Sequence, residues 1–186
     1  MRGRNTGPLV WCAVTLLTVT GCATSASPSR PVSPVVTPTL DAQAAKSRRP
    51  DPGAVGIGLA KIALAHTDST DTVTFEFTGN AIPGWAVHYV RQALQNDTQT
   101  IIPIAAPAVL EVLVREAANP FQSAPPPYSG PAVLSDPTLS TIGEVRFASV
   151  VRGVTQVFIA LRTEQVGFRV SGALDPARVV VEFERR

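Results

Sequence analysis

The sequence predicts an all-β protein: an antiparallel β-sandwich preceded by a signal peptide and a disordered Pro-rich stalk. From Gly53 onward, short runs of β-branched residues alternate with Gly, Pro, Asp and Asn, a pattern typical of sandwiches and barrels. No segment after Cys22 has the 3.6-residue periodicity of a long amphipathic helix. We therefore expect three parts: a signal peptide at 1–21, a linker at 22–52, and a single sandwich domain at 53–186.

The candidate strands of this domain show a two-residue alternation of apolar and polar side chains. The clearest lies at 72–78, where Val73, Phe75 and Phe77 share one face. Gly, Pro, Asn and Asp between the runs supply the turns. The other expected strands are 57–65, 85–91, 100–104, 109–115, 144–151, 154–162, 167–171 and 178–183.

A Pro-rich segment from Ala117 to Thr141 interrupts the strands. It carries Phe121 and Tyr128, and loops of this length inside compact domains often serve a function. One interpretation is a rigid loop that faces a ligand. The favoured one is a loop that covers a sheet edge, with an aromatic ring tucked into the core.

The N-terminus has the features of a lipoprotein export signal. Arg2 and Arg4 give a positive start, and residues 9–19 form an apolar run of 11 residues, too short for the roughly 20 that span a bilayer. The run ends in Val-Thr-Gly-Cys, which resembles the bacterial lipobox, with cleavage between Gly21 and Cys22. We expect acyl chains on Cys22 to anchor the protein to the membrane. The alternative is an ordinary signal peptide or a short anchor in which Cys22 is incidental.

The linker at 22–52 is rich in Pro, Ser, Thr and Ala and lacks strand or helix periodicity. As an extended chain of about 3.1 Å per residue it reaches at most about 90 Å. We interpret it as a passive spacer between the membrane and the domain. Recognition of its prolines by a partner is the alternative.

Charge and cysteine content exclude several function classes. The chain has 16 Lys and Arg against 14 Asp and Glu, without the dense basic patch of a nucleic-acid binder. Removing Arg2 and Arg4 with the signal makes the mature chain neutral, and the part from Gly53 carries 10 basic and 12 acidic residues. The only cysteine left is Cys22, so we expect no disulfide framework, no metal site and no cofactor.

The sequence lacks a recognisable catalytic set, and we expect a protein that is not an enzyme. No nucleophile elbow or zinc-binding helix motif occurs, and His66 and His88 are the only histidines. The stretch from His66 to Asp71 could hold a cation, but turn formation explains its residues more simply. The glutamates fall one per strand, and no two of them stand out as an acid–base pair.

A binding surface would use aromatic or Arg side chains on an exposed face. Alternation places Arg146 and Arg169 outward, whereas Trp85 and Tyr89 belong to the expected core. The candidate ligand-contacting residues are Tyr128, Arg146, Arg169 and Arg178.

Several motifs, in order, resemble those of bacterial AMIN-like domains. They are TVTFEFTG at 72–79, PGWAVHYV at 83–90, YSGP at 128–131, EVRF at 144–147, GVTQVFIAL at 153–161, FRV at 168–170 and LDPARVVVEF at 174–183. Thr72, Gln156 and Glu182 depart from the usual pattern. The resemblance implies a non-catalytic β-sandwich of envelope proteins, and related AMIN domains target their proteins to peptidoglycan or envelope assemblies.

Together these features lead us to expect a lipoprotein on the extracytoplasmic face of the cell membrane. Its expected partners are the membrane, through the acyl anchor on Cys22, and peptidoglycan or another envelope protein. Two alternatives stay open at this point: a carrier of a small apolar ligand held between the sheets, and an unrecognised cell-wall hydrolase.

Overall fold

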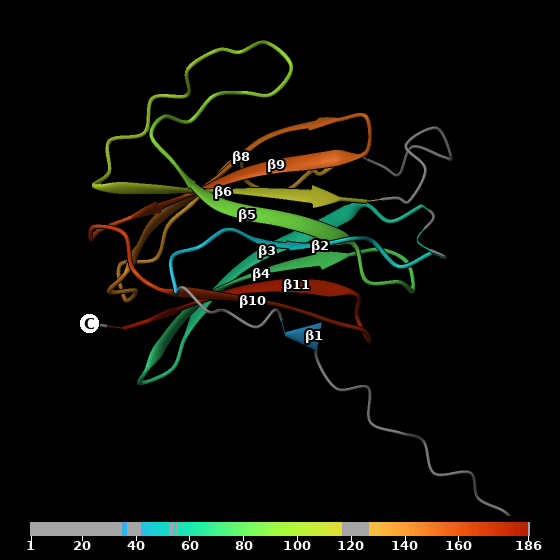
Figure 1. The fold of residues 1–186 in the computed structure, drawn as a ribbon, viewed down its shortest axis with the longest axis horizontal. Helices are drawn as coiled ribbons and strands as arrows, with labels where there is room; N and C mark the ends of the chain where they lie inside the picture. The colour runs from blue at the N-terminus through green and yellow to red at the C-terminus, as the bar shows by residue number, and fades with distance from the viewer. Residues whose placement is uncertain (1–34, 37–41, 53, 55, 117–126, 186) are drawn as a thin grey trace, which may run out of the picture. The chain divides into compact units, whose positions relative to one another are not determined.

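The computed structural model describes residues 35–36, 42–52, 54, 56–116 and 127–185, which form two antiparallel sheets packed face to face (Figure 1). The predicted all-β sandwich is confirmed, and the described residues contain no helix. One sheet has five strands in the order β1 (Val35–Val36), β10 (Phe168–Ala173), β11 (Arg178–Glu184), β4 (Thr70–Phe77) and β3 (Leu59–His66). The other has six, in the order β2 (Lys46–Arg48), β5 (Gly84–Val90), β6 (Ala108–Arg115), β9 (Val154–Leu161), β8 (Ile142–Val151) and β7 (Val133–Leu134).

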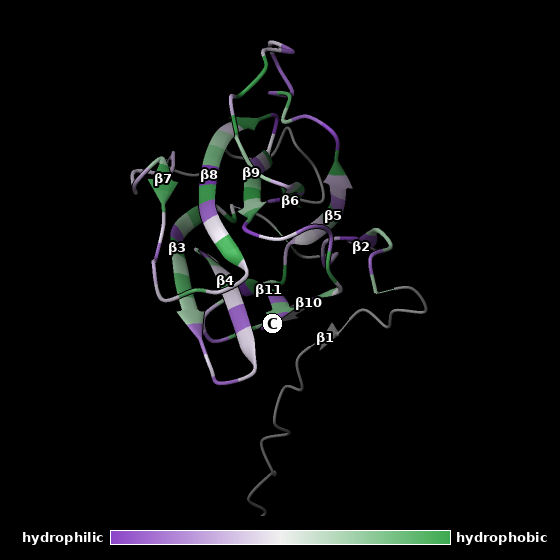
Figure 2. Ribbon diagram, turned by 90° about the vertical axis from the view of Figure 1, so that its left-hand side faces the viewer, coloured by the Kyte–Doolittle hydropathy of each residue, from purple (hydrophilic) through white to green (hydrophobic). Residues whose placement is uncertain are grey.

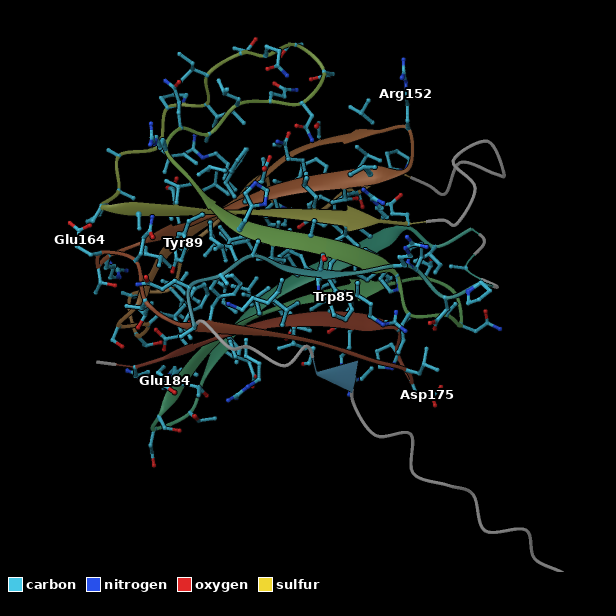
Figure 3. All side chains as sticks on the ribbon, viewed as in Figure 1. Trp85, Tyr89, Arg152, Glu164, Asp175 and Glu184 are labelled. Atoms are coloured by element: carbon cyan, nitrogen blue, oxygen red, sulfur yellow. The ribbon has the colours of Figure 1, made fainter. Side chains whose placement is uncertain are left out.

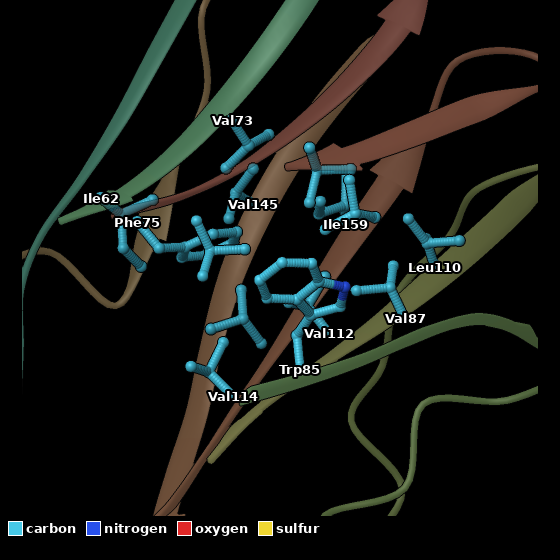
Figure 4. Close-up of a cluster of buried hydrophobic side chains, with 14 of the residues drawn as sticks. Ile62, Val73, Phe75, Trp85, Val87, Leu110, Val112, Val114, Val145 and Ile159 are labelled. Carbon is cyan, nitrogen blue, oxygen red and sulfur yellow. The ribbon is translucent and has the colours of Figure 1, made fainter. Parts of the chain in front are cut away.

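Aliphatic and aromatic side chains from both sheets fill the space between them. Strand β4 alternates strictly, so Val73, Phe75 and Phe77 are buried as predicted while the residues between them reach solvent. Trp85 of β5 lies among valines and Leu110 from the same sheet and Phe75 from the facing one (Figure 4). Figure 2 shows the corresponding residue-by-residue change of hydropathy along the strands.

The predicted strand at 100–104 is wrong. Only one isolated bridge forms there, between Leu94 and Ile101, within a long connection from β5 to β6. This connection, residues 91–107, is called the excursion below and forms the upper green loop in Figure 1. Pro103 and Pro107 lack the N–H groups that a ladder needs, so the apolar residues of the segment pack on a sheet face instead.

The expected start of the domain at Gly53 is also corrected, because residues 42–52 of the predicted linker pack on the sandwich. We call them the clasp. Their strand β2 pairs with β5, and Lys46 is only 2% exposed, with its Nζ 3.8 Å from the centroid of the Phe168 ring. The backbone N–H of Phe168 donates to Ala42 O (3.0 Å), which ties the clasp to the other sheet as well.

The far end of the clasp is held by Asp51. Its carboxylate accepts from the Arg48 guanidinium (2.5 Å) and from the backbone N–H of Ile82 (3.1 Å). Gly84 leaves room for this arrangement, since a Cβ there would lie 2.5 Å from Pro50 and 2.9 Å from Arg48 O. Tight contacts therefore fix the clasp at both of its ends.

The Pro-rich segment covers a sheet edge where it is described. Residues 117–126, including Phe121, lie outside the described residues. Beyond them β7 pairs with β8, and the Tyr128 ring packs on Phe147 with the centroids 4.9 Å apart. This arrangement matches the favoured interpretation of a loop that covers an edge.

Candidate binding face

The outer face of the six-stranded sheet is partly covered by the excursion. Phe158 points away from the main core yet is fully buried, because Ala93 and residues from 102 to 106 pack over it together with Val109. The excursion is itself a hairpin, with Gln95 N–H donating to Thr100 O and Ile102 N–H to Ala93 O (2.9 Å each). The excursion therefore covers this face around Phe158, whereas Val133, opposite Arg146 of β8, stays exposed.

A buried polar network pins the excursion to the sheet. Gln156 is fully buried and donates from its amide nitrogen to Leu94 O (2.8 Å) and to Glu111 Oε1 (2.6 Å). Its amide oxygen accepts from the backbone N–H of Asn96 (2.9 Å). The other oxygen of Glu111 lies 3.1 Å from His88 Nε2. Glu111 and His88 thus have structural partners here. Gln156, which departs from the usual AMIN-like pattern, holds the excursion on the sheet.

The outer face of the five-stranded sheet carries exposed and half-exposed side chains from β3, β4, β11 and β10. We call it the open face. Cross-strand register arranges it in rows that run across the strands. The first row is Lys61, Glu76, Arg178 and Ala173; the second is Ala63, Thr74, Val180 and Ser171; the third is Ala65, Thr72, Glu182 and Arg169.

Two charged rows therefore flank a strip of small side chains, formed by the second row. Arg178 and Glu182 stand four residues apart on β11, which separates the charged rows by about 13–14 Å at 3.3–3.4 Å per residue. The strip between them bears only small side chains that end in methyl or hydroxyl groups. Such a surface suits an extended chain with charged groups at both of its ends.

The ion pairs of the open face are long and solvated. Lys61 Nζ lies 3.5 Å from Glu76 Oε1 and Arg169 Nη1 lies 4.0 Å from Glu182 Oε2, with the two cationic side chains 61% and 59% exposed. Pairs of this kind contribute little to stability, because water competes for both partners. Their charges are therefore available to a ligand at small cost.

The four predicted contact residues lie in three places: the open face, strand β8 and the segment before β7. Arg169 and Arg178 both lie on the open face, and Arg178 also donates to Pro176 O (3.3 Å). Arg146 lies on β8 of the other sheet, where its guanidinium donates to Glu144 (2.8 Å) with both side chains mostly covered. Tyr128 is packed on Phe147 and donates to Pro131 O (3.3 Å), and burial raises the pKa of its hydroxyl. The structure does not bring the four together.

Sequence reasoning missed Lys61 and the threonines of the open face. Lys61 belongs to the edge strand β3, and only the pairing of β3 with β4 places it opposite Glu76. The signal that could have found this surface is the run of Thr72, Thr74 and Glu76 at alternate positions of one strand.

The aromatic residues expected in the core lie there. Trp85 is 1% exposed, and Tyr89 packs edge-on against Phe168 with the ring centroids 5.6 Å apart. The Tyr89 hydroxyl donates to Val166 O (2.7 Å) and accepts from Val166 N–H, and burial raises its pKa. Both rings lie between the layers, whereas Arg152, Glu164, Asp175 and Glu184 project at the surface (Figure 3).

Two buried acids face the interior, one on each sheet. Asp71 accepts from Thr141 N–H (2.7 Å) and lies 3.4 Å from the Arg185 guanidinium. Glu116 accepts from the Thr155 hydroxyl, and burial raises its pKa although that bond lowers it in part. Asp71 is engaged by structural bonds, as is one oxygen of Glu116.

The stretch from His66 to Asp71 forms the β3–β4 hairpin. Thr67 N–H donates to Thr70 O (2.8 Å), and Thr70 N–H donates to the Thr67 hydroxyl (3.1 Å). Asp71 turns inward, away from a cation site in the loop. Within the described ranges, no group of three His, Cys, Asp or Glu side chains is placed to hold a metal ion.

Comparison with known proteins identifies this fold. Residues 58–185 match a family described as the AMIN-like domain. The chain belongs to the AMIN-like family. No curated protein and no solved structure matches the chain. The clasp precedes the matched residues.

The membrane anchor lies outside the described part of the chain, as do Gly21 and Cys22. Among the described residues, no helix would reach across a bilayer.

Proposed function

We propose that this chain is a non-catalytic, membrane-anchored envelope protein that binds peptidoglycan through the open face. Family membership supports the class, since the AMIN-like resemblance implies extracytoplasmic binding modules. The single observation that carries the location of the site is the contrast between the outer faces. The excursion covers one of them around Phe158, whereas the other offers loosely paired charges around a strip of small side chains.

The anchor in this proposal is the acylated Cys22 at the outer surface of the membrane. Two or more acyl chains hold a protein stably at a bilayer, where a single chain does not. Residues 23–34 then join the anchor to β1, the first strand of the domain. A chain of 12 residues spans at most about 40 Å at about 3.1–3.4 Å per residue, which is shorter than the whole linker predicted from sequence.

Sedimentation of the full-length chain, kept in detergent, with purified sacculi tests the proposal. We expect the wild-type chain to pellet with the sacculi, and the double variant Arg169→Gln/Arg178→Gln to bind about tenfold more weakly, because two exposed charge contacts are lost. The matched control is Arg152→Gln, which removes an exposed charge from the β8–β9 turn of the other sheet and should leave binding unchanged.

Two results would contradict the proposal. The first is no sedimentation with sacculi at any concentration at which the chain stays soluble. The second is retention by crude walls that disappears once wall proteins are removed with protease and hot detergent. That second outcome would make a wall-associated protein the partner.

A further inference from the structure

The chemistry of the open face also indicates which part of a wall polymer it suits. Sugars are commonly held against aromatic rings, whose flat apolar faces cover the C–H side of a pyranose. The large hydrophobic residues exposed in the described part of the chain are Leu94, Ile101, Val133 and Val150, none of them aromatic. No residue in the three rows of the open face is aromatic. This face has no stacking platform for a glycan.

The ion pairs of the molecule differ in how readily they exchange partners. Arg146 and Glu144 are 2.8 Å apart and mostly covered, and Asp71 is fully buried beside Arg185. On the open face the separations are 3.5 and 4.0 Å and both cations are well exposed. An incoming carboxylate or ammonium therefore finds its opposite charge on the open face, with the least existing structure to displace.

The spacing of these charges sets the length of the ligand. About 13–14 Å separates the first row from the third along β11, and an extended peptide of four residues spans the same distance. The strip between the rows consists of Ala63, Thr74, Val180 and Ser171, so no bulky side chain stands in the way of an extended peptide.

Resting on the proposed function, we infer that the open face binds a short extended peptide of four or five residues, not the glycan backbone. The peptide has a free terminal carboxylate, as do the peptide stems that substitute cell-wall glycan. This carboxylate lies at Lys61 and Arg178 of the first row, and the peptide chain runs over the strip towards the third row.

The first experiment compares two wall preparations, using the full-length chain in detergent. One is intact sacculi, and the other is glycan strands from which an amidase has removed the peptide stems. We expect intact sacculi to retain the chain at least about tenfold better than the stripped strands. Equal retention by both would overturn the peptide inference and leave peptidoglycan binding standing. Retention by neither would overturn both.

The second experiment assigns the carboxylate end of the peptide. The probe is a synthetic tetrapeptide, L-Ala–D-Glu–diaminopimelate–D-Ala, used as a competitor with its terminal carboxylate free or amidated. For the wild-type chain, we expect the amide cap to weaken competition about three- to tenfold.

A variant should remove this sensitivity. Arg178→Gln should no longer distinguish the free from the amidated carboxylate, as in a double-mutant cycle. Arg152→Gln is the control that keeps the sensitivity. An Arg178→Gln chain that binds more weakly yet responds to the cap like the wild-type chain would contradict the assigned contact.

Discussion

At the end of β6, Glu116 turns its carboxyl group into the sandwich, where it is 2% exposed. Burial raises its pKa above the ordinary value of 4.5, and the bond from Thr155 offsets only part of the rise. A carboxyl with a raised folded-state pKa contributes its full stability below the unfolded pKa and loses it as pH rises through the folded pKa. Glu116 therefore makes the fold less stable as pH rises above about 4.5.

The variant Glu116→Gln tests this linkage, since a glutamine stays neutral and still accepts from Thr155. We expect the free energy of unfolding of the wild-type chain to fall relative to that of the variant as pH rises from 4.5 towards 8, as measured by urea denaturation. Glu164→Gln, at an exposed site, is the control and should run parallel to the wild-type chain. If the free energy of unfolding of Glu116→Gln changed with pH as that of the wild-type chain does, the Glu116 carboxyl would not drive the pH dependence.

Gly172 is a second residue with a sharp steric requirement. A Cβ at this inward position of β10 would lie 2.7 Å from Ile82 Cγ2 and 3.0 Å from the Trp85 ring. Because the core is close-packed, we expect Gly172→Ala to cost about 1–3 kcal/mol of unfolding free energy. Gly143→Ala is the matched control, since its nearest contact would be an ordinary 3.4 Å. Equal thermal midpoints for the two variants would contradict close packing of Trp85 on β10.

At the scale of elements, the clasp depends on the absence of a side chain at Gly84. An alanine there would push Pro50 and Arg48 away from β5 and so loosen the β2–β5 pairing. We expect Gly84→Ala to speed amide exchange of Lys46–Arg48 about tenfold or more, while the central strand β4 stays protected. Gly143→Ala again serves as the control. Unchanged exchange at Lys46–Arg48 would mean that the clasp does not need this close approach.

The elements that could be predicted are those whose pattern is local. Strand β4 alternates apolar and polar residues throughout, and β6 and β11 have enough valine at alternate positions to be recognised. The clasp was missed because Lys-Ser-Arg has no such pattern. Its burial depends on the Phe168 ring and the β5 edge, which are distant in sequence. The excursion was misread because a short apolar run serves equally well as a strand or as the cover of a sheet.

The candidate site was predictable to the same extent. Alternation was sufficient to turn Arg169 outward, since it depends only on neighbours in the chain. Grouping it with Lys61 and Thr74 requires the register of four strands, which a single sequence does not contain. Arg146 was predicted to be available to a ligand, but its charge is paired within the fold. Its partner Glu144 stands two residues away on the same face, so the sequence already held the reason why its charge is engaged.

At the scale of the whole molecule, the two outer faces have separate tasks. The six-stranded sheet uses its outer face for stability, because Gln156 and Phe158 hold the excursion there. On the five-stranded sheet, no apolar segment among the described residues packs over the outer face. Strand β1 adds a short edge strand beside β10. Both β1 and the clasp lie at sheet edges, with β1 beside β10 and β2 beside β5, so neither of them covers the open face.

This arrangement makes the role of the anchor testable apart from that of the domain. Each buried methylene contributes about 0.8 kcal/mol to membrane binding, so losing two or more acyl chains removes most of the attachment. We expect Cys22→Ser to abolish incorporation of labelled palmitate and to release the protein from washed membranes. Its binding to purified sacculi should be unchanged, because Cys22 precedes the clasp and the open face. Cys12→Ser, within the apolar run of the signal, is the matched control and should leave labelling and attachment intact. A Cys22→Ser chain that stays membrane-bound after the wall has been digested would show that the apolar run, and not an acylated cysteine, is the anchor.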